Sequence, residues 1–410
     1  MVNPTAPRPA WPRRVPVLDW IRVGLFVLGG VCVATGLLPF AEAEATMRRV
    51  LPILAFLATV IILAELTAEA GVFDVIAARI AIAGRGRFVA LFGMCGAFAA
   101  VTTIALNLDT TAVLLFPVML ATARKVGMPG LPLAMTTLWL ANTASLLLPV
   151  SNLTNLLAAN RVDLGVTEYA QVMGLPQVAS IAVTMVCLWA FYWRPGVRGP
   201  GAGGPLGHRY TVPPPHTPRD RTLFWTAAGA CVVFLVCVAV NAPLQIASTI
   251  CAALLAVAFA VRMRDRLRWS LLPWRLLIFV TGLFLVVQTI SAHGLDDVMR
   301  ALIGPDGGPA GVFRAAGTGA GAANLVNNLP SYLAGEAAVP VANHTQLLGL
   351  LIGTNVGPLV TPWASLATLL CYERARTDGV RIPLARFVLT GLVTAVATLL
   401  ASIAALVLTG

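Results

Sequence analysis

The chain has 410 residues, of which 58% are hydrophobic and only 11% are charged, and its mean hydropathy is +0.85. These values exclude an ordinary soluble globular protein and indicate that the lipid bilayer is its solvent. The net charge of +11 does not indicate nucleic acid, because the basic residues form short groups beside apolar segments without interleaved aromatic residues. Seven cysteines without CxxC or paired spacing argue against a disulfide framework or a zinc site, and we expect no cofactor.

Apolar stretches of about 20 residues, the length that crosses a hydrocarbon core as a helix, recur along the chain. The first follows a polar, basic segment and is too long for the apolar region of a signal peptide, so we interpret it as a first spanning helix. The fold class that we expect is therefore an all-α polytopic membrane protein. The predicted stretches are 17–40, 50–69, 172–193, 223–240, 246–261, 272–290 and 384–408.

The placement of arginine predicts the orientation of these helices, since cytoplasmic loops carry an excess of Lys and Arg. Residues 1–16 are then a cytoplasmic N-terminal segment of a multi-pass protein of the cell (cytoplasmic) membrane. The count works only if re-entrant hairpins enter from the cytoplasm at about 88–123 and from outside at about 311–342. Each hairpin tip predicts a cavity, because non-helical backbone at membrane depth needs polar partners. Five of the 28 Lys and Arg residues then lie outside: Arg48, Arg49, Arg161, Arg300 and Arg314.

A polar stretch rich in Gly and Pro, residues 195–221, divides the chain into a first transmembrane half (17–194) and a second (222–410). Its composition is typical of a flexible cytoplasmic linker. Two histidines, His208 and His216, lie eight residues apart in it. We expect them to be solvated rather than metal ligands.

Both halves contain the same motif. Aligned without gaps, residues 141–153 match residues 354–366, with Asn, Pro and Leu coinciding at three positions. Because proline removes a backbone donor, each motif predicts a discontinuous helix, at about 131–158 and about 345–371. Since the first hairpin enters from the cytoplasm and the second from outside, we predict two inverted repeats, each with a re-entrant hairpin and a discontinuous transmembrane helix. Many secondary transporters have this organisation.

Polar side chains gather at the hairpin tips and helix breaks, where freed carbonyls and half-helix ends can coordinate a small solute or ion. Any one of them could simply hydrogen-bond a neighbouring helix. Their clustering beside prolines at matching places in both halves favours a site. The predicted substrate-binding residues are Asn107, Thr110, Asn142, Thr143, Ser151, Asn152, Asn327, Asn328, Asn355, Thr361 and Ser365.

Few acidic residues lie within the apolar segments, and an ionisable group at that depth is costly enough to suggest a function. Asp109, in the first tip, is the best candidate for a proton- or cation-binding group, with a helix cap as the alternative. Glu65 is a second candidate for proton coupling, although a structural hydrogen bond explains it equally well. Glu69 lies where it can reach cytoplasmic water, and the role of Glu336 is open.

These segments resemble the arsenical pump membrane protein family, within the ion transporter superfamily that also holds sodium-coupled dicarboxylate carriers. The resemblance implies extrusion of arsenite and antimonite in exchange for protons. It leaves open a cytoplasmic arsenite-stimulated ATPase as a partner, and a homodimer is also left open. The resemblance covers residue 50 to the C-terminus and is carried, in order, by residues 108–117, 141–145, 150–153, 327–330, 357–358, 361–362 and 365–370.

The residue types of the predicted site suit a neutral solute. Arsenous acid is an uncharged trihydroxide, so amides and hydroxyls can hold it without a counter-charge. A dicarboxylate would call for cationic partners or several half-helix N-termini, and no Lys or Arg falls within either tip or broken helix. Two other transport functions stay open: a cation-coupled permease for a carboxylate or inorganic anion, and the membrane subunit of an ATPase-driven arsenite pump. An enzyme is least favoured, because no catalytic His/Asp or Ser/His cluster is evident.

Overall fold

The computed structural model describes residues 17–105, 107–197, 209–240 and 242–409. The predicted cytoplasmic segment 1–16 and much of the predicted linker, 198–208, lie outside the described residues. Helices make up almost all the regular structure of the described part, which also has one isolated bridge between Arg87 and Arg209.

The helices before the linker are interrupted at the places where the sequence places the first tip and the first break. A π-helical turn, η1 (Thr111–Leu115), joins α5 to α6, and another, η3 (Trp189–Trp193), ends α9. The helices are α1 (Val17–Ala34), α2 (Phe40–Glu69), α3 (Val72–Ala83), α4 (Phe88–Ala105), α5 (Leu108–Thr110), α6 (Phe116–Lys125), α7 (Leu131–Thr143), α8 (Leu153–Arg161) and α9 (Val166–Leu188).

The helices after the linker follow a similar order. They are α10 (Arg221–Ala239), α11 (Leu244–Arg262), α12 (Trp274–Ile290), α13 (Asp296–Ile303), α14 (Pro309–Val326), α15 (Asn328–Ala338), α16 (His344–Val356), α17 (Leu366–Thr377) and α18 (Leu384–Thr409). The long α12 is followed by the shorter α13, then by the hairpin pair α14 and α15 and by the broken pair α16 and α17.

Six helical segments of the described chain are long and apolar enough to cross a membrane. This confirms an all-helical multi-pass membrane protein. Two further apolar helices, Val23–Ala34 and Arg221–Cys237, are shorter. The six segments are Phe40–Glu69, Phe88–Ala105, Val166–Trp193, Gln245–Arg262, Leu277–Leu295 and Leu384–Leu408.

The boundary between the first two predicted spans is wrong. The stretch predicted to span 17–40 ends as a helix at Ala34, and α2 begins at Phe40, ten residues before the predicted start at residue 50. The prediction assigns the charged residues of this first part of α2 to neither span. Instead they form a polar extension of the helix, in which Arg48 donates to Glu44 one turn earlier at 2.6 Å.

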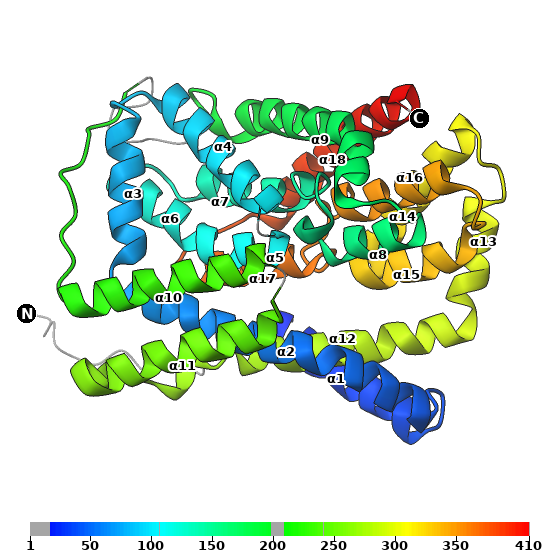
Figure 1. Cartoon of the computed structure of the whole chain (residues 1–410), viewed down its shortest axis with the longest axis horizontal. Coiled ribbons are helices and arrows are strands. Elements are labelled where there is room, and N and C mark those ends of the chain that lie inside the picture. The colour runs from blue at the N-terminus through cyan, green and yellow to red at the C-terminus, as the bar shows by residue number, and fades with distance from the viewer. Residues whose placement is uncertain (1–16, 106, 198–208, 241, 410) are drawn as a thin grey trace, which may run out of the picture.

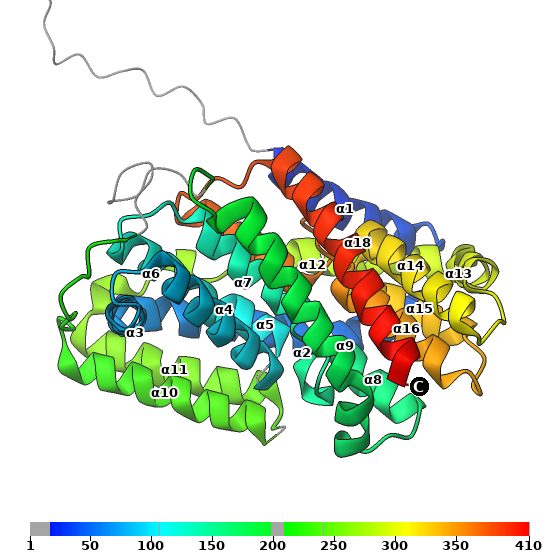
Figure 2. The same ribbon diagram turned by 90° about the horizontal axis from the view of Figure 1, so that it is seen from above.

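The helices form two groups (Figure 1). We call α1, α2, α10, α11 and α12 the lower layer, because they lie together along the bottom of the view, with α1 packed on α12 and α2 packed on α11. We call α4–α9 and α14–α18 the upper body. Seen from above, α9 and α18 run side by side across it (Figure 2). In the chain, α3 and α13 lead from the lower layer into the two hairpins.

Small residues allow a close contact in the upper body, between α14 and α16. A Cβ added at Gly353 would lie 2.1 Å from the carbonyl oxygen of Ala316, and one at Gly349 would lie 2.7 Å from Val312. Helices in membranes gain packing energy from such close approach. The second hairpin is therefore held firmly against the second broken helix.

The described part of the predicted linker packs on the protein surface rather than running free. The Tyr210 ring lies edge-on to Phe88 with centroids 5.2 Å apart, and its hydroxyl donates to the Ala81 carbonyl at 2.6 Å. Its amide donates to the Gly86 carbonyl at 2.7 Å. One buried aromatic side chain thus fixes a segment that its Gly and Pro content predicts to be flexible.

Candidate functional site

Each hairpin turns at an asparagine. In the first, α4 ends at Ala105 and α5 begins after Asn107, whose side-chain oxygen accepts from the Thr110 amide at 2.7 Å. This is a helix N-cap. In the second, Asn327 separates α14 from α15 with φ +99°, a backbone region that non-glycine residues seldom adopt. The Asn327 side chain donates to the Trp363 carbonyl at 2.8 Å.

Each broken helix restarts at a capped N-terminus. The chain leaves α7 after Thr143, passes through a short 3-10 turn and enters α8, where the Asn152 side chain accepts from the Thr154 amide at 3.3 Å. In the second half, the Ser365 hydroxyl oxygen accepts from the Thr368 amide at 3.1 Å at the start of α17. Asn152 and Ser365 occupy aligned positions in the two motifs. Both act as N-caps at the point where the backbone becomes helical again.

The two broken helices exchange equivalent hydrogen bonds. The Asn142 amide of α7 donates to the Thr368 hydroxyl of α17 at 3.0 Å. The Asn355 amide of α16 donates to the Asn155 side-chain oxygen of α8 at 2.7 Å, and Thr154 donates to the Asn355 oxygen at 2.7 Å. The motif alignment pairs Asn142 with Asn355 and Asn155 with Thr368. The aligned asparagine of each half therefore donates a hydrogen bond to the aligned acceptor residue of the other half.

Side-chain amides replace the backbone hydrogen bonds that the breaks remove. The Gln177 oxygen accepts from the amides of Leu146 and Leu147 at 2.7 and 3.0 Å. In the second half, the Asn324 oxygen accepts from the amides of Val360 and Thr361 at 3.2 and 3.1 Å. Interrupted backbone at membrane depth is tolerable when protein groups satisfy it in this way.

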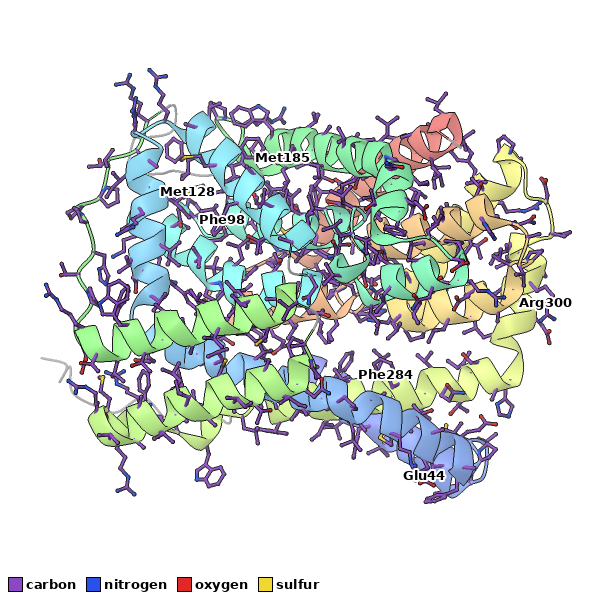
Figure 3. All side chains as sticks on the ribbon, viewed as in Figure 1. Glu44, Phe98, Met128, Met185, Phe284 and Arg300 are labelled. Atoms are coloured by element: carbon purple, nitrogen blue, oxygen red, sulfur yellow. The ribbon has the colours of Figure 1, made fainter. Side chains whose placement is uncertain are left out.

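A central cavity of about 410 Å³ lies where the upper body faces the lower layer. The N-terminal ends of four half-helices, α5, α8, α15 and α17, contribute to its wall. Lower-layer side chains, including Phe56, Gln245 and Phe284, form the opposite wall. Phe284 lies on α12 at the junction of the two groups of helices (Figure 3). Five predicted site residues line this cavity: Asn107, Asp109, Asn152, Asn327 and Asn328.

The cavity combines positive backbone ends with a single carboxylate. Helix N-termini carry partial positive charge and unpaired N–H groups, so four of them favour oxygen-rich ligands. One oxygen of Asp109 and the side-chain nitrogen of Asn152 are buried without a hydrogen-bond partner among the described residues. No Lys or Arg is among the described residues that line the cavity. The site can therefore accept and donate hydrogen bonds, and its described lining residues include one carboxyl group able to exchange a proton.

The other predicted substrate-binding residues do not line the central cavity, and most use their polar atoms within the protein. Ser151 donates to the Ile104 carbonyl at 2.8 Å, and Thr361 donates to the Asn324 carbonyl at 2.9 Å. The Thr143 hydroxyl donates to the Trp139 carbonyl at 2.9 Å. These residues support the frame around the cavity. The group comprises Thr110, Asn142, Thr143, Ser151, Asn355, Thr361 and Ser365.

Glu65 lies away from the central cavity. It lines a second cavity of about 400 Å³, where its carboxylate accepts a hydrogen bond from Arg374. Glu69, one turn further along α2, pairs with Arg266 at 3.1 Å. Glu336 accepts from the Tyr332 hydroxyl at 3.4 Å.

Sequence reasoning missed the residues that complete the frame: Asn155, Gln177 and Thr368. Asn155 and Thr368 lie two residues beyond the aligned motifs, so a slightly longer alignment would have included both. Gln177 was detectable as an amide beside Pro176 within a largely apolar helix. Asn324 lies three residues before Asn327 of the second tip, but its role in holding the break at residues 357–361 depends on the fold.

Helices interrupted around an interior cavity, with six candidate membrane spans in the described part of the chain, define a polytopic membrane transporter. Residues 16–368 match the family model described as citrate transporter. The chain is 30% identical to the arsenical pump membrane protein of Escherichia coli (strain K12) over 86% of this chain and 85% of that protein. The chain therefore belongs to the arsenical pump membrane protein family, within the broader citrate transporter family, and it is a transporter rather than an enzyme.

Other sequence relatives belong to the same family, whereas the similarity to a solved structure is weak. A second arsenical pump membrane protein of Escherichia coli is 29% identical over 93% of this chain and 92% of its own length. The putative arsenical pump membrane protein of Bacillus subtilis (strain 168) is 22% identical over 73% of this chain and 74% of its own. The solved structure of the Alcanivorax borkumensis YdaH transporter matches 97% of this chain and 98% of that one, with 13% identity and a TM-score of 0.43. A likeness of that size does not assign a fold.

Proposed function

We propose that this protein is a secondary transporter that extrudes arsenite and antimonite across the cytoplasmic membrane in exchange for protons. The observation that carries the proposal is the composition of the central cavity, which offers amides, half-helix ends and one carboxylate, with no Lys or Arg among its described lining residues. Arsenous acid is neutral, so its three hydroxyls can be bound without the cost of burying an ion. The names of the relatives point to the same class of solute.

The proposed substrate contacts come from both tips and one helix break. Asn107, Asn327 and Asn328 offer amide groups, and Asn152 has an amide nitrogen without a partner among the described residues. Asp109 is the proposed proton carrier, because it is the acidic residue among those that line the cavity. In the proposed cycle, Asp109 takes up a proton on the outer side after the solute leaves. It releases that proton on the cytoplasmic side before the next solute binds.

The proposal includes two inverted repeats, residues 17–194 and 222–410, which a linker joins. It also places the N-terminus in the cytoplasm. The exchanged bonds Asn142–Thr368 and Asn355–Asn155 support it, because residues related by a twofold axis contact each other reciprocally. The arginine distribution supports opposite orientations of the two hairpins. Alternating access would then be a movement of one group of helices against the other around the site.

A cation-coupled permease for a carboxylate or an inorganic anion is the second candidate. The four half-helix N-termini at the cavity favour it, because their partial positive charges attract anions. The carboxylate of Asp109 in the same wall opposes it unless a cation binds there too. The third candidate is the membrane subunit of an ATPase-driven pump, which would carry the same cavity and differ in its energy source.

Transport into everted membrane vesicles distinguishes the three candidates. The antiporter accumulates arsenite without ATP when respiration maintains a proton gradient, and a protonophore abolishes the accumulation. Uptake that needs ATP and persists with the protonophore identifies the pump subunit. Sodium-dependent transport of citrate or sulfate, with no arsenite uptake, identifies the permease.

A further inference from the structure

The second cavity lies next to the central one along the same three stretches of chain. On α17 its lining begins at Leu370, directly after Leu369 of the central cavity. On the first hairpin it begins at Ala112, three residues after Asp109, and on α2 at Ile61. At 1.5 Å per residue, separations of one to five residues correspond to about 2–8 Å along each stretch, so the two linings are adjacent. The two cavities are therefore arranged end to end.

Both cavities also separate the same two groups of helices. The second has lower-layer side chains from α2 and from residues 271–274 on one side, and upper-body side chains from η1 and α17 on the other. Between the two cavities, Leu57 and Val60 of α2 are fully buried, as are Thr110 and Thr111 of the hairpin. Along both stretches the residues between the two linings are thus packed within the protein and line neither cavity, and we call them the packed layer.

An ion pair joins the two groups of helices at the second cavity. Arg374 of α17, in the upper body, donates to Glu65 of α2, in the lower layer. Their side chains are only 19% and 32% exposed, so water screens the attraction poorly. Arg374 also contacts Asp378 at 3.2 Å, which fixes the guanidinium on its own helix.

The equivalent arginine of the first half has no ion pair with a lower-layer residue among the described residues. Arg161, at the position of α8 that aligns with Arg374, interacts electrostatically with Glu336 of α15. Both of these residues belong to the upper body, so their interaction does not resist a movement of the body against the lower layer. The Arg374–Glu65 pair does resist it.

Building on the proposed function, we propose that the second cavity is the cytoplasmic chamber of the transport path and that Glu65 and Arg374 form the latch that closes it. The chamber takes up a small, neutral, polyhydroxylated solute from the cytoplasm. With the pair formed, α17 is held against α2 and the packed layer separates the chamber from the central cavity. Opening requires the pair to separate. Glu65 thus controls access to the central cavity, and Asp109 binds and releases the proton.

Chemical labelling of a reporter in the central cavity tests the latch without any transport measurement. Leu366→Cys, at the start of α17, places a thiol in the central cavity. In everted vesicles, a membrane-impermeant maleimide reaches this thiol only through the cytoplasmic chamber. Labelling of the parent chain, with its seven native cysteines, is subtracted as background. Glu65→Gln and Arg374→Gln should each raise the labelling rate about tenfold, the change that about 1.4 kcal/mol of lost latch energy gives.

Two matched variants make the test specific. Arg374→Lys keeps the charge and should label within about twofold of the parent, because a lysine can still pair with Glu65. Glu69→Gln removes an acid one turn away on the same helix, whose partner Arg266 lies in the loop after α11 of the lower layer, and should leave labelling unchanged. Membrane abundance of each variant is measured with a C-terminal tag. If one Gln variant fails to insert, the other decides.

The outcomes separate this inference from the proposed function. Faster labelling in the Gln variants, with no arsenite uptake by the parent chain, supports the latch and removes the proposed solute. Proton-driven arsenite uptake, with labelling that is unchanged in inserted Gln variants, supports the proposed function and overturns the latch. A rise that Glu69→Gln reproduces also overturns it, because the effect would then be general loosening.

Discussion

The two hairpin tips share a plan and differ in how their asparagines are used. In each, a hydroxyl four residues later donates to the asparagine carbonyl, from Thr111 to Asn107 at 2.8 Å and from Ser331 to Asn327 at 2.7 Å. The Asn107 side chain caps its own helix, whereas the Asn327 side chain donates to the Trp363 carbonyl of the second break. The Asn107 side chain is thus used within its own tip, and the Asn327 side chain fastens the second tip to the neighbouring broken helix.

The tips also differ in charge at the same position. The second residue after the asparagine is Asp109 in the first tip and Leu329 in the second, and both line the central cavity. The second tip is further fixed by the backbone N–H of Asn328, which donates to the Ala364 carbonyl at 2.8 Å. A duplicated frame therefore carries one carboxylate at its centre. The comparison indicates that one half supplies the ionisable group while the other supplies a rigid wall.

Removal of that carboxylate should have the largest effect. We expect Asp109→Asn to reduce proton-driven arsenite accumulation in everted vesicles to background while the protein still inserts at the parent level. The amide keeps the shape of the side chain and can no longer exchange a proton. Asp297→Asn, at a carboxylate whose side chain is 81% exposed, is the matched control and should transport normally. Parent-like transport with an unchanged pH profile in Asp109→Asn would remove this residue from the mechanism.

The two sets of hydrogen bonds between the broken helices, those of Asn355 and that of Asn142, should contribute unequally to stability. Asn355→Ala leaves Thr154 and Asn155 without the partners that Asn355 provides, and unsatisfied buried groups cost about 1–3 kcal/mol each. Asn142→Ala should cost only about 1 kcal/mol. The reason is that Thr368 keeps its bond to Ser365 at 2.9 Å, and the side-chain oxygen of Asn142 already lacks a partner among the described residues.

Thermal unfolding of the purified protein in detergent measures this difference. Asn355→Ala should lower the unfolding midpoint clearly more than Asn142→Ala. The double variant should show whether the two bonds are independent, since distant sites add and coupled ones do not. Equal midpoints for the single variants would show that the Asn355 contacts contribute no more than the Asn142 contact, contrary to the asymmetry seen in the structure.

Much of this frame could be predicted from the sequence because its signals are local. Proline and asparagine within apolar stretches mark helix breaks whatever the surroundings, so Asn107, Asn152 and Asn327 were identified without a fold. The charged start of α2 was left out of the predicted span because this prediction also used local signals alone. Local composition suggests a loop there, while a helix can extend past the bilayer when ion pairs such as Arg48–Glu44 cover its surface.

The rest of the site depends on contacts between residues far apart in the chain. Whether a buried amide faces a cavity or another helix is decided by packing, which separates Asn328 from Asn355 although both lie in similar polar motifs. Glu65 had two equally good interpretations, because its partner Arg374 is 309 positions away. Paired positions of this kind can be found only when the two halves are placed against each other.

The backbone difference between the two tips should give the smallest effect. Asn327 lies at φ +99° and ψ 153°, a region nearly confined to glycine that costs a residue with a side chain about 1–3 kcal/mol. Asn327→Gly should therefore be more stable than Asn327→Ala by about 2 kcal/mol. At Asn107 the backbone is extended, with φ 163° and ψ 172°, so Gly should exceed Ala only by about 0.5 kcal/mol as a helix cap.

Unfolding midpoints of the four single variants measure the two differences in the same buffer and detergent. Each Gly variant has the Ala variant at the same position as its control, so loss of the asparagine side chain cancels within each pair. A larger Gly-over-Ala advantage at 327 than at 107 means that the second tip stores backbone strain, which its bond to Trp363 helps to hold. Equal advantages would mean that both tips relax to ordinary backbone geometry, and the contrast between the two asparagines would fail.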